Sequence, residues 1–314
     1  MDKLKIVFMG TPDFSVPVLN GLIENYDVIG VVTQPDKEVG RNHEIKFSPI
    51  KEVALKNDIR VLQPVKIRNE YENIIKLNPD MIVTCAYGQI LPKILLDLPK
   101  YGCINVHASL LPKYRGGAPL HRCVINGDSK TGITIMYMDE KMDSGDIISQ
   151  REILINNNDT VGIIHDKLSV LGSELLLDTI PSIVSGNNSR TKQNESEVTY
   201  APIIKREDEL IDFNKTSLEI YNRIRGLNPF PVAYANLFGK VVKIYNSYIS
   251  NNVYTSAKNG EIVRIHSDGI GVSTSDSEIV ITEIKIEGKR RMSVKEYLNG
   301  INKDELIGKV FNED

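Results

Sequence analysis

The sequence predicts an α/β protein, in which a mainly parallel twisted sheet is followed by a small β-barrel domain. In the front part of the 314-residue chain, short apolar runs alternate with stretches of helical periodicity. In the back part, short runs with strand character are separated by turn signals such as Asn259-Gly260 and Asp268-Gly269. The alternation favours a parallel sheet that is covered on both faces, and the closely spaced short strands favour a barrel.

Each element of the front part follows from its apolar pattern. Strands are expected at residues 5–9, 28–33, 61–62, 81–86, 103–107, 131–139 and 146–155. Helices are expected at residues 15–25, 46–56, 70–77 and 160–184. Ser48-Pro49 supplies a cap and a first-turn proline for the second helix, and Asn78-Pro79 ends the third. In such sheets ligands bind beyond the carboxyl ends of the strands, where residues 10–13 and 105–119 fall.

The back part begins after a polar, turn-rich stretch that runs from Ser185 to Asn194. We expect a first domain at residues 1–186, a linker at 187–206 that can wrap the first domain, and a second domain at 207–314. A helix is expected at 217–225, and strands at 233–237, 240–249, 261–266, 269–273 and 278–286. A last helix at 294–299 is stopped by Gly300.

Composition excludes several classes of protein. Hydrophobic residues make up 41% of the chain and charged residues 25%, as in ordinary soluble domains. The net charge of -3 means that any contact with RNA requires a local basic patch. The apolar run 6–9 is too short for a signal peptide, and no other run is expected to span a membrane. Cys85, Cys103 and Cys123 lack CxxC spacing and predict reduced thiols in a cytoplasmic protein.

Asn105 and His107 are the strongest candidates for chemistry. Residues two apart on a strand share a face, so both side chains project together where the sheet gives way to a loop rich in proline and glycine. Histidine can exchange a proton near neutral pH, and asparagine offers uncharged donors to an oxyanion. A lone His107 would more often be structural. A metal site is disfavoured because His107 and His121 belong to no cluster with ligand spacing.

Other segments leave alternatives open. Asp143 lies in a loop between two expected strands, and by sequence alone a solvated turn aspartate is the more ordinary interpretation. The turn 10–13 lacks the GxGxxG glycines, which argues against a nicotinamide dehydrogenase and leaves a plain connection as the alternative. Residues 87–92 follow a strand and could line a pocket for a flat ring, or form an ordinary exit from the sheet.

Two basic segments suit phosphate contacts. The connection that contains Lys37 and Arg41 is long for a link between strand and helix, and long loops in compact domains are usually functional or disordered. Lys46 and Lys51 extend its positive charge. The run Lys289-Arg290-Arg291 is the densest basic spot of the back part. A solvated charged surface is the alternative for both.

Several motifs together resemble the methionyl-tRNA formyltransferases, a family of folate-dependent enzymes, over nearly the whole chain. They are the turn 9–14, the basic loop 34–51, the aspartate loop 142–146, and the entry to the second domain at 200–212 and 228–231. The signature itself is Asn105-Val106-His107-Ala108-Ser109-Leu110-Leu111-Pro112, followed by Tyr114-Arg115-Gly116-Gly117-Ala118-Pro119. This signature alone indicates a folate-dependent formyltransferase, and the assignment to tRNA needs the basic loop and the second domain.

The resemblance implies a fold, a reaction and a set of site residues. It implies a Rossmann-like formyltransferase domain and an OB-like barrel that helps to hold tRNA. The formyl group of 10-formyltetrahydrofolate would pass to methionine on initiator tRNA, without a metal, in a cytoplasmic protein expected to be a monomer. It implies catalysis by Asn105, His107 and Asp143, folate binding by Ser109, Leu110, Leu111 and Pro112, and tRNA contacts by Arg41, Lys37 and Lys205.

The chain departs from the family pattern at two aromatic positions, and two rival functions remain. It contains no tryptophan, and Phe213 and Phe230 stand where the family often has one, so that stacking or packing there would be weaker. One rival is a formyltransferase that acts on a sugar nucleotide or small amine, which would carry the same signature. The other is a non-catalytic RNA-binding relative, which the presence of Asn105, His107 and Asp143 disfavours.

Overall fold

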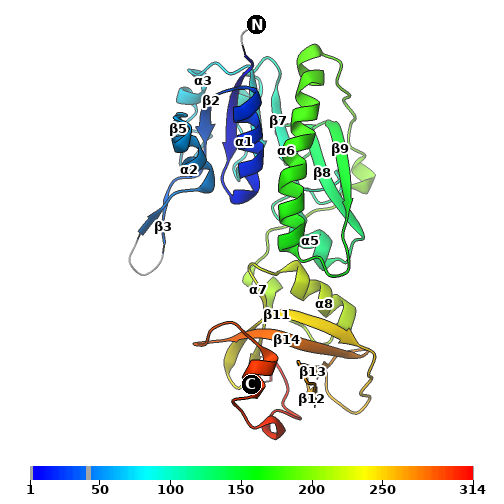
Figure 1. Ribbon diagram of the computed structural model, residues 1–314. Helices are drawn as coiled ribbons and strands as arrows, with labels where there is room; N and C mark the ends of the chain where they lie inside the picture. Colours follow the sequence, from blue (N-terminus) through cyan, green and yellow to red (C-terminus); the bar gives the residue numbers. More distant parts are fainter. Residues whose placement is uncertain (1–2, 40–43, 314) are drawn as a thin grey trace. The chain divides into compact units, whose positions relative to one another are not determined.

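The computed structural model describes residues 3–39 and 44–313, and the chain divides into two compact units. Unit 1 combines Met1–Pro119, Lys130–Leu154 and His165–Pro202, and unit 2 combines Leu120–Ser129, Ile155–Ile164 and Ile203–Asp314. Figure 1 shows the helices and strands of both units.

Unit 1 is built on a seven-stranded sheet in the order β5-β2-β1-β6-β7-β8-β9. The strands are β1 (Lys5–Gly10), β2 (Asp27–Val32), β5 (Val61–Leu62), β6 (Met81–Cys85), β7 (Cys103–His107), β8 (Lys130–Tyr137) and β9 (Ile147–Leu154). The strands from β5 to β7 are parallel, whereas β8 and β9 are added antiparallel. The predicted mainly parallel sheet is therefore confirmed, and β6 is buried along its whole length because both faces are covered.

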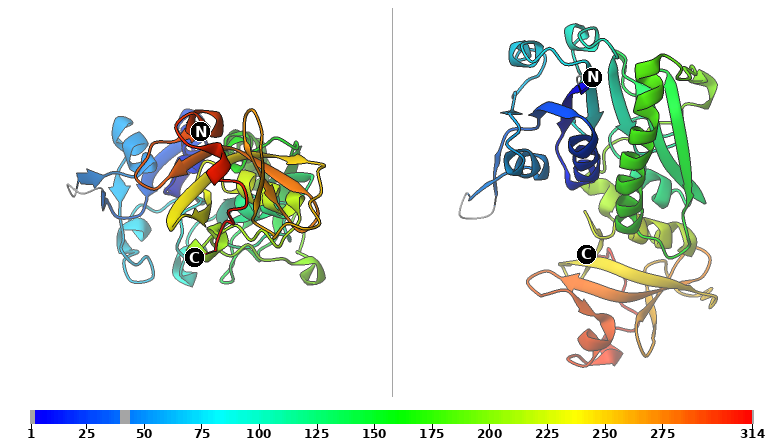
Figure 2. Two further views of the ribbon diagram at one scale, coloured as in Figure 1. Left: turned by 90° about the horizontal axis from the view of Figure 1, so that it is seen from below. Right: turned by 45° about the horizontal axis from the view of Figure 1, so that its top comes forward.

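Helices α1 (Val16–Asn25) and α6 (Val161–Ser185) lie side by side on one face of this sheet (Figure 1 and Figure 2). Their close approach requires Gly21, because a Cβ there would meet the Ser173 hydroxyl at 2.5 Å. Gly172 of α6 lies in the same way against Val106 of β7 and Ile133 of β8. Helix α6 therefore covers the strand that carries the first two candidate residues.

Two of the remaining helices of unit 1 are shorter than expected, and a third was not expected. Helix α2 (Pro49–Lys56) begins after Ser48, whose hydroxyl accepts a hydrogen bond from the Lys51 amide, as the capping signal predicts. Helix α3 (Glu72–Ile75) was expected over residues 70–77. After α3 the backbone hydrogen bonds join residues three apart, from Leu77 to Ile74 and from Asn78 to Ile75, as in a 3-10 helix. Asn78 then ends the helical segment with a positive φ of 48°. Helix α4 (Lys93–Leu96) was not predicted.

A small hairpin occupies the segment that was expected to be a long basic loop. Strands β3 (Lys37–Val39) and β4 (Glu44–Lys46) pair antiparallel. At its base, Lys51 Nζ lies 2.5 Å from Asp36 Oδ2 and 3.0 Å from Gln63 Oε1. Lys51 therefore holds the connection in place, and its charge is already compensated by Asp36.

Unit 2 contains an antiparallel sheet in the order β10-β11-β14-β13-β12, with β15 paired to β14. Its strands are β10 (Ala233–Leu237), β11 (Lys240–Ser250), β12 (Ile262–Ile265), β13 (Ile270–Ser273), β14 (Glu278–Ile286) and β15 (Met292–Ser293). Its helices include α5 (Pro119–Ile125, from Leu120 onward), α7 (Arg206–Glu209), α8 (Ser217–Gly226) and α9 (Val294–Leu298). The prediction of a second domain built from short antiparallel strands is confirmed.

The two phenylalanines at the departures from the family pattern have different surroundings. Phe213 is buried in the core of unit 2, where its ring stacks on Phe311 with centroids 5.5 Å apart. Phe230 is 76% exposed. Phe213 therefore contributes to packing, whereas Phe230 offers a free ring face to solvent.

Helix α6 is long and apolar enough to cross a membrane, by length and composition alone. The expectation that no segment is long enough to span a membrane was therefore wrong as to length. Half of its most apolar window is buried inside the protein, as in the core helix of a globular domain, so the helix is weak evidence for a span.

Candidate functional site

The carboxyl end of β7 carries two of the predicted residues. Asn105 is half-buried, and His107 is the last residue of the strand, with 6% of its surface exposed. Strand β7 lies between parallel β6 and antiparallel β8, so rigid neighbours fix its backbone on both sides. Both residues are thus placed on an ordered element where the sheet ends, as the two-residue spacing predicted.

Thr84 of β6 fixes the orientation of the Asn105 side chain. Its hydroxyl donates a hydrogen bond to Asn105 Oδ1 at 2.8 Å, and it is also close to the Ile104 carbonyl and the Met138 sulfur. Because the amide oxygen is held by Thr84, the Nδ2 hydrogens point to the opposite side. Asn105 therefore presents donors, and the sequence pattern gave no signal for the threonine that orients it.

We expect Thr84→Val to lower kcat by up to about a hundredfold, because Asn105 loses the contact that aims its amide and small displacements of a site group are costly. The KM values for both substrates should change little. Thr179→Val is the matched control, since this buried threonine contacts the Leu175 carbonyl at 2.6 Å and the Ser149 hydroxyl at 2.7 Å, and neither residue belongs to the site. Steady-state kinetics checks the prediction, and equal kcat values for the two variants would contradict it.

His107 connects two loops. Its Nε2 lies 3.0 Å from the Tyr114 carbonyl oxygen, which can only accept, so Nε2 carries a proton and donates it. The other ring nitrogen, Nδ1, lies 3.7 Å from Asp143 Oδ2. The backbone bond therefore fixes the orientation of the ring and leaves Nδ1 as the atom that faces the carboxylate.

Asp143 is held in an unusual backbone conformation beside His107. Its φ is 51°, in the left-handed region, and 17% of its side chain is exposed. Its Oδ2 accepts a hydrogen bond from the Gly116 amide at 2.8 Å. Gly145, two residues on, lies so close to the Tyr137 carbonyl that a Cβ would overlap it. The aspartate is thus a positioned carboxylate rather than a solvated turn residue.

The segment expected to bind folate is held firmly by neighbouring strands. Thr134 of β8 donates to the Ser109 carbonyl at 2.6 Å and accepts from the Leu111 amide at 3.1 Å. The Ser109 hydroxyl is buried and donates to the Lys113 carbonyl at 2.6 Å. The peptide bond between Leu111 and Pro112 is cis. Leu110 and Pro112 remain half-buried and are the members of this segment that can touch a ligand.

Residues 87–92 mostly stabilise the protein's own loops. The Tyr87 ring is buried in the core, and its carbonyl accepts from Gln34 Nε2 at 3.0 Å. Gln89 accepts from the Ile67 amide at 2.9 Å. Burial raises the pKa of the nearby Cys85 thiol to about 12, so Cys85 carries no thiolate nucleophile at neutral pH.

The basic residues predicted to contact tRNA lie in different parts of the chain. Lys37 is exposed on β3, and Arg41 lies outside the described residues. Lys205 is exposed before α7, where its Nζ lies 3.4 Å from Glu207. In the run 289–291, Arg290 pairs with Glu296 and Arg291 pairs with Glu283 at 2.7 Å, so part of its charge is neutralised.

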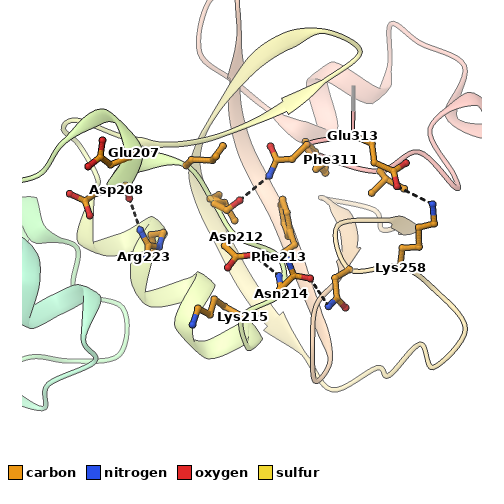
Figure 3. Close-up of a pocket in the computed structure, with 15 residues that line it drawn as sticks. Glu207, Asp208, Asp212, Phe213, Asn214, Lys215, Arg223, Lys258, Phe311 and Glu313 are labelled. Atoms are coloured by element: carbon orange, nitrogen blue, oxygen red, sulfur yellow. Dashed lines mark hydrogen bonds and ion pairs between the residues drawn. The ribbon is translucent and has the colours of Figure 1, made fainter.

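A large cavity of about 760 Å³ lies in unit 2 (Figure 3). Its charged side chains already have partners: Lys258 pairs with Glu313 at 3.0 Å, and Arg223 donates to the Asp208 carbonyl. Asp212 accepts from Asn214. The cavity contains none of the residues at the end of β7, so its size does not identify the reaction site. Among the described residues, no group of three or more histidine, cysteine, aspartate or glutamate side chains could hold a metal.

Comparison with known families and proteins gives consistent matches along the chain. Residues 4–180 match the model described as formyl transferase, and residues 203–302 match the formyl transferase C-terminal domain. A methionyl-tRNA formyltransferase of Bacillus subtilis (strain 168) is 54% identical over 300 residues, which cover 94% of each chain. That of Bacillus thuringiensis subsp. konkukian (strain 97-27) is 55% identical and covers 95% of this chain and 96% of its own.

Solved structures share the fold at lower identity. The sugar 3N-formyl transferase WlaRD, crystallised in the presence of dTDP and 5-N-formyl-THF, aligns with a TM-score of 0.67 and 21% identity. The alignment covers 92% of this chain and all of WlaRD. HypX from Aquifex aeolicus aligns with a TM-score of 0.65 and 18% identity, over 96% of this chain and 50% of HypX.

Proposed function

The chain belongs to the formyl transferase family, and we propose that it transfers the formyl group of 10-formyltetrahydrofolate to the α-amine of methionine on initiator methionyl-tRNA, for translation initiation. The observation that carries this function is the 54% identity to a methionyl-tRNA formyltransferase over 94% of both chains, which includes the second domain. Asn105 and His107 at the end of β7, with Asp143 held beside His107, support it.

The reaction needs no enzyme nucleophile. The α-amine of the aminoacyl ester is partly neutral at pH 7, since α-amines titrate at about 8. Its nitrogen attacks the formyl carbon, the bond from that carbon to the folate nitrogen breaks, and the formyl oxygen carries negative charge in between. One proton leaves the amine and one reaches the folate nitrogen, so the step involves no oxidation or reduction.

Each of the three residues has a distinct role in this proposal. Asn105 directs its Nδ2 hydrogens, which the bond from Thr84 leaves available, at the developing oxyanion. His107 donates to the same charge from Nε2, sharing with it the hydrogen that the Tyr114 carbonyl accepts in this structure, and such a donor contributes roughly 3 kcal/mol to lowering the barrier. Asp143 orients His107 across the 3.7 Å gap and takes up the amine proton, directly or through water. These roles require no group that the site does not already hold in place.

Binding of the two substrates is divided along the chain. Ser109, Leu110, Leu111 and Pro112 form the folate-binding stretch of the catalytic domain, residues 1–186. Residues 187–206 link it to residues 207–314, which hold tRNA together with Lys37, Arg41 and Lys205. The enzyme acts as a cytoplasmic monomer.

The test is transfer of labelled formyl from 10-formyltetrahydrofolate to charged initiator tRNA by the purified protein. We expect rapid transfer to initiator methionyl-tRNA and slow transfer to elongator methionyl-tRNA. A dTDP-amino sugar serves as a competing acceptor, because sugar formyltransferases share the fold. Preferential transfer to the sugar, or no transfer to any acceptor, would overturn the proposal. The KM for tRNA should rise steeply with salt through lost phosphate contacts, while the KM for folate should rise less.

A further inference from the structure

A segment of unit 1 outside the signature joins the two loops of the site. This segment, residues 190–201, is called the strap below. Toward the aspartate loop, Arg190 Nε lies 3.1 Å from Asp146 Oδ2, and Thr191 exchanges two backbone hydrogen bonds with Ile147. Toward the loop after β7, the strap residues Thr199 and Ala201 bond the backbone of residues 114, 115 and 118. The strap therefore contacts both loops that hold His107 and Asp143.

Gln193 is the centre of the strap. Its Nε2 donates to the carbonyl of Asp143 and to the carbonyl of Gly145, both at 2.8 Å. Its Oε1 accepts from Arg115 Nε at 3.0 Å. Carbonyl oxygens only accept and a guanidinium only donates, so the reverse orientation of the amide would lose all three bonds. The side chain is thus fixed in one orientation, with both amide hydrogens on the aspartate loop.

Arg115 holds the amide oxygen of Gln193, on the side opposite to the aspartate loop. Only 4% of Arg115 is exposed, and its Nη2 lies 2.9 Å from Glu195 Oε1. The same hydrogen bonding holds the pKa of the Glu195 carboxyl below its usual value. Arg115 directly follows Tyr114, whose carbonyl binds His107, and precedes Gly116, whose amide binds Asp143. Contacts of Gln193, Arg115 and the residues on either side of Arg115 therefore connect His107 with Asp143.

We propose that Gln193 is a positioning residue for the formyl transfer, which acts by holding the Asp143 loop against His107. The inference rests on the proposed role of Asp143. Asp143 has a positive φ of 51°, a conformation that a non-glycine residue adopts at a cost. The two bonds from Gln193 brace the backbone on both sides of Ser144 and so hold the carboxylate at its distance from Nδ1.

Gln193→Glu is the sharpest test, because the side chain keeps its shape and its contact with Arg115. The carboxylate loses both donors and places negative charge against two carbonyl oxygens, so the loop should shift. We expect kcat to fall on the order of a hundredfold, since displacement by about 1 Å costs that much. The KM for tRNA and the thermal unfolding temperature should change little. Asn188→Asp is the matched control, since this half-buried amide lies just before the strap and donates to the neighbouring Ser189 carbonyl at 3.0 Å.

A double-mutant cycle with Asp143→Asn separates positioning from a general structural role. If Gln193 acts through Asp143, Gln193→Glu should slow the wild type strongly but slow the Asp143→Asn variant little further. Full additivity, or a normal kcat in Gln193→Glu while Asp143→Asn is slow, would overturn the inference and leave the proposed function intact. A normal kcat in Asp143→Asn would instead contradict the proposed role of Asp143. A large drop in unfolding temperature with kcat unchanged would show a purely structural role.

Discussion

Replacement of Asp143 by asparagine is expected to lower kcat by about a hundredfold to ten-thousandfold, the usual range for the loss of a general base. The new side chain has the same size and can still accept the hydrogen bond from the Gly116 amide at 2.8 Å. It has no negative charge to offer to His107 Nδ1 at 3.7 Å, and it cannot take up the amine proton. The loop should therefore stay in place while the chemistry fails.

Asp139→Asn provides the matched control for this experiment. Asp139 is an exposed carboxylate at the other end of the same loop, where it accepts a hydrogen bond from the Glu140 amide. Measurement of kcat and of both KM values should show a loss for Asp143→Asn alone. If the two variants turned over formyl groups equally fast, Asp143 would be a turn residue and would have no part in proton transfer.

The pairing of Asn105 with His107 could be predicted because it depends only on local geometry. Residues two apart on one strand share a face, and β7 has the expected bounds, residues 103–107. Thr84 and Gln193 were missed because their contacts join residues 21 and 50 positions apart. Such contacts depend on the order of the strands and on the path of the strap, which periodicity does not encode.

Asp143 shows the limit of local patterns in another way. An aspartate near glycine usually lies in a solvated turn, and the sequence alone favoured that interpretation. In the structure, Gly145 lets the loop pass close to the Tyr137 carbonyl, and Gly116 provides the amide that binds the carboxylate. The two glycines therefore hold the aspartate in place, and only tertiary contacts distinguish the two cases.

The fold could be predicted where apolar residues recur with a regular period, and not where they are sparse. The alternation of buried strands with helices in unit 1 reflects the burial of each element against its neighbours, so the pattern gives the topology class. Strands β3 and β4 are three residues long, and β4 is exposed throughout. Because β4 has no buried face, it leaves no alternating signal, and the segment was therefore interpreted as a loop.

Replacement of His107 by alanine is expected to lower kcat by a hundredfold or more, because it removes the group that joins the oxyanion to Asp143. The change also removes the hydrogen bond to the Tyr114 carbonyl at 3.0 Å, which should cost about 0.5–1.5 kcal/mol of unfolding free energy. A domain with a stability of about 5–15 kcal/mol remains mostly folded after such a loss. Unfolding therefore cannot account for a hundredfold fall in kcat.

His165→Ala is the control that isolates chemistry from the mere loss of an imidazole. His165 belongs to the same unit and also faces carboxylates, with its ring nitrogens 3.5 Å from Asp13 and 2.9 Å from Asp166. It is 28% exposed and follows no strand end, so its removal should leave kcat near normal. Thermal unfolding measured alongside kcat decides the matter, because a His107→Ala protein that is both folded and fast would mean that the oxyanion is stabilised without the histidine.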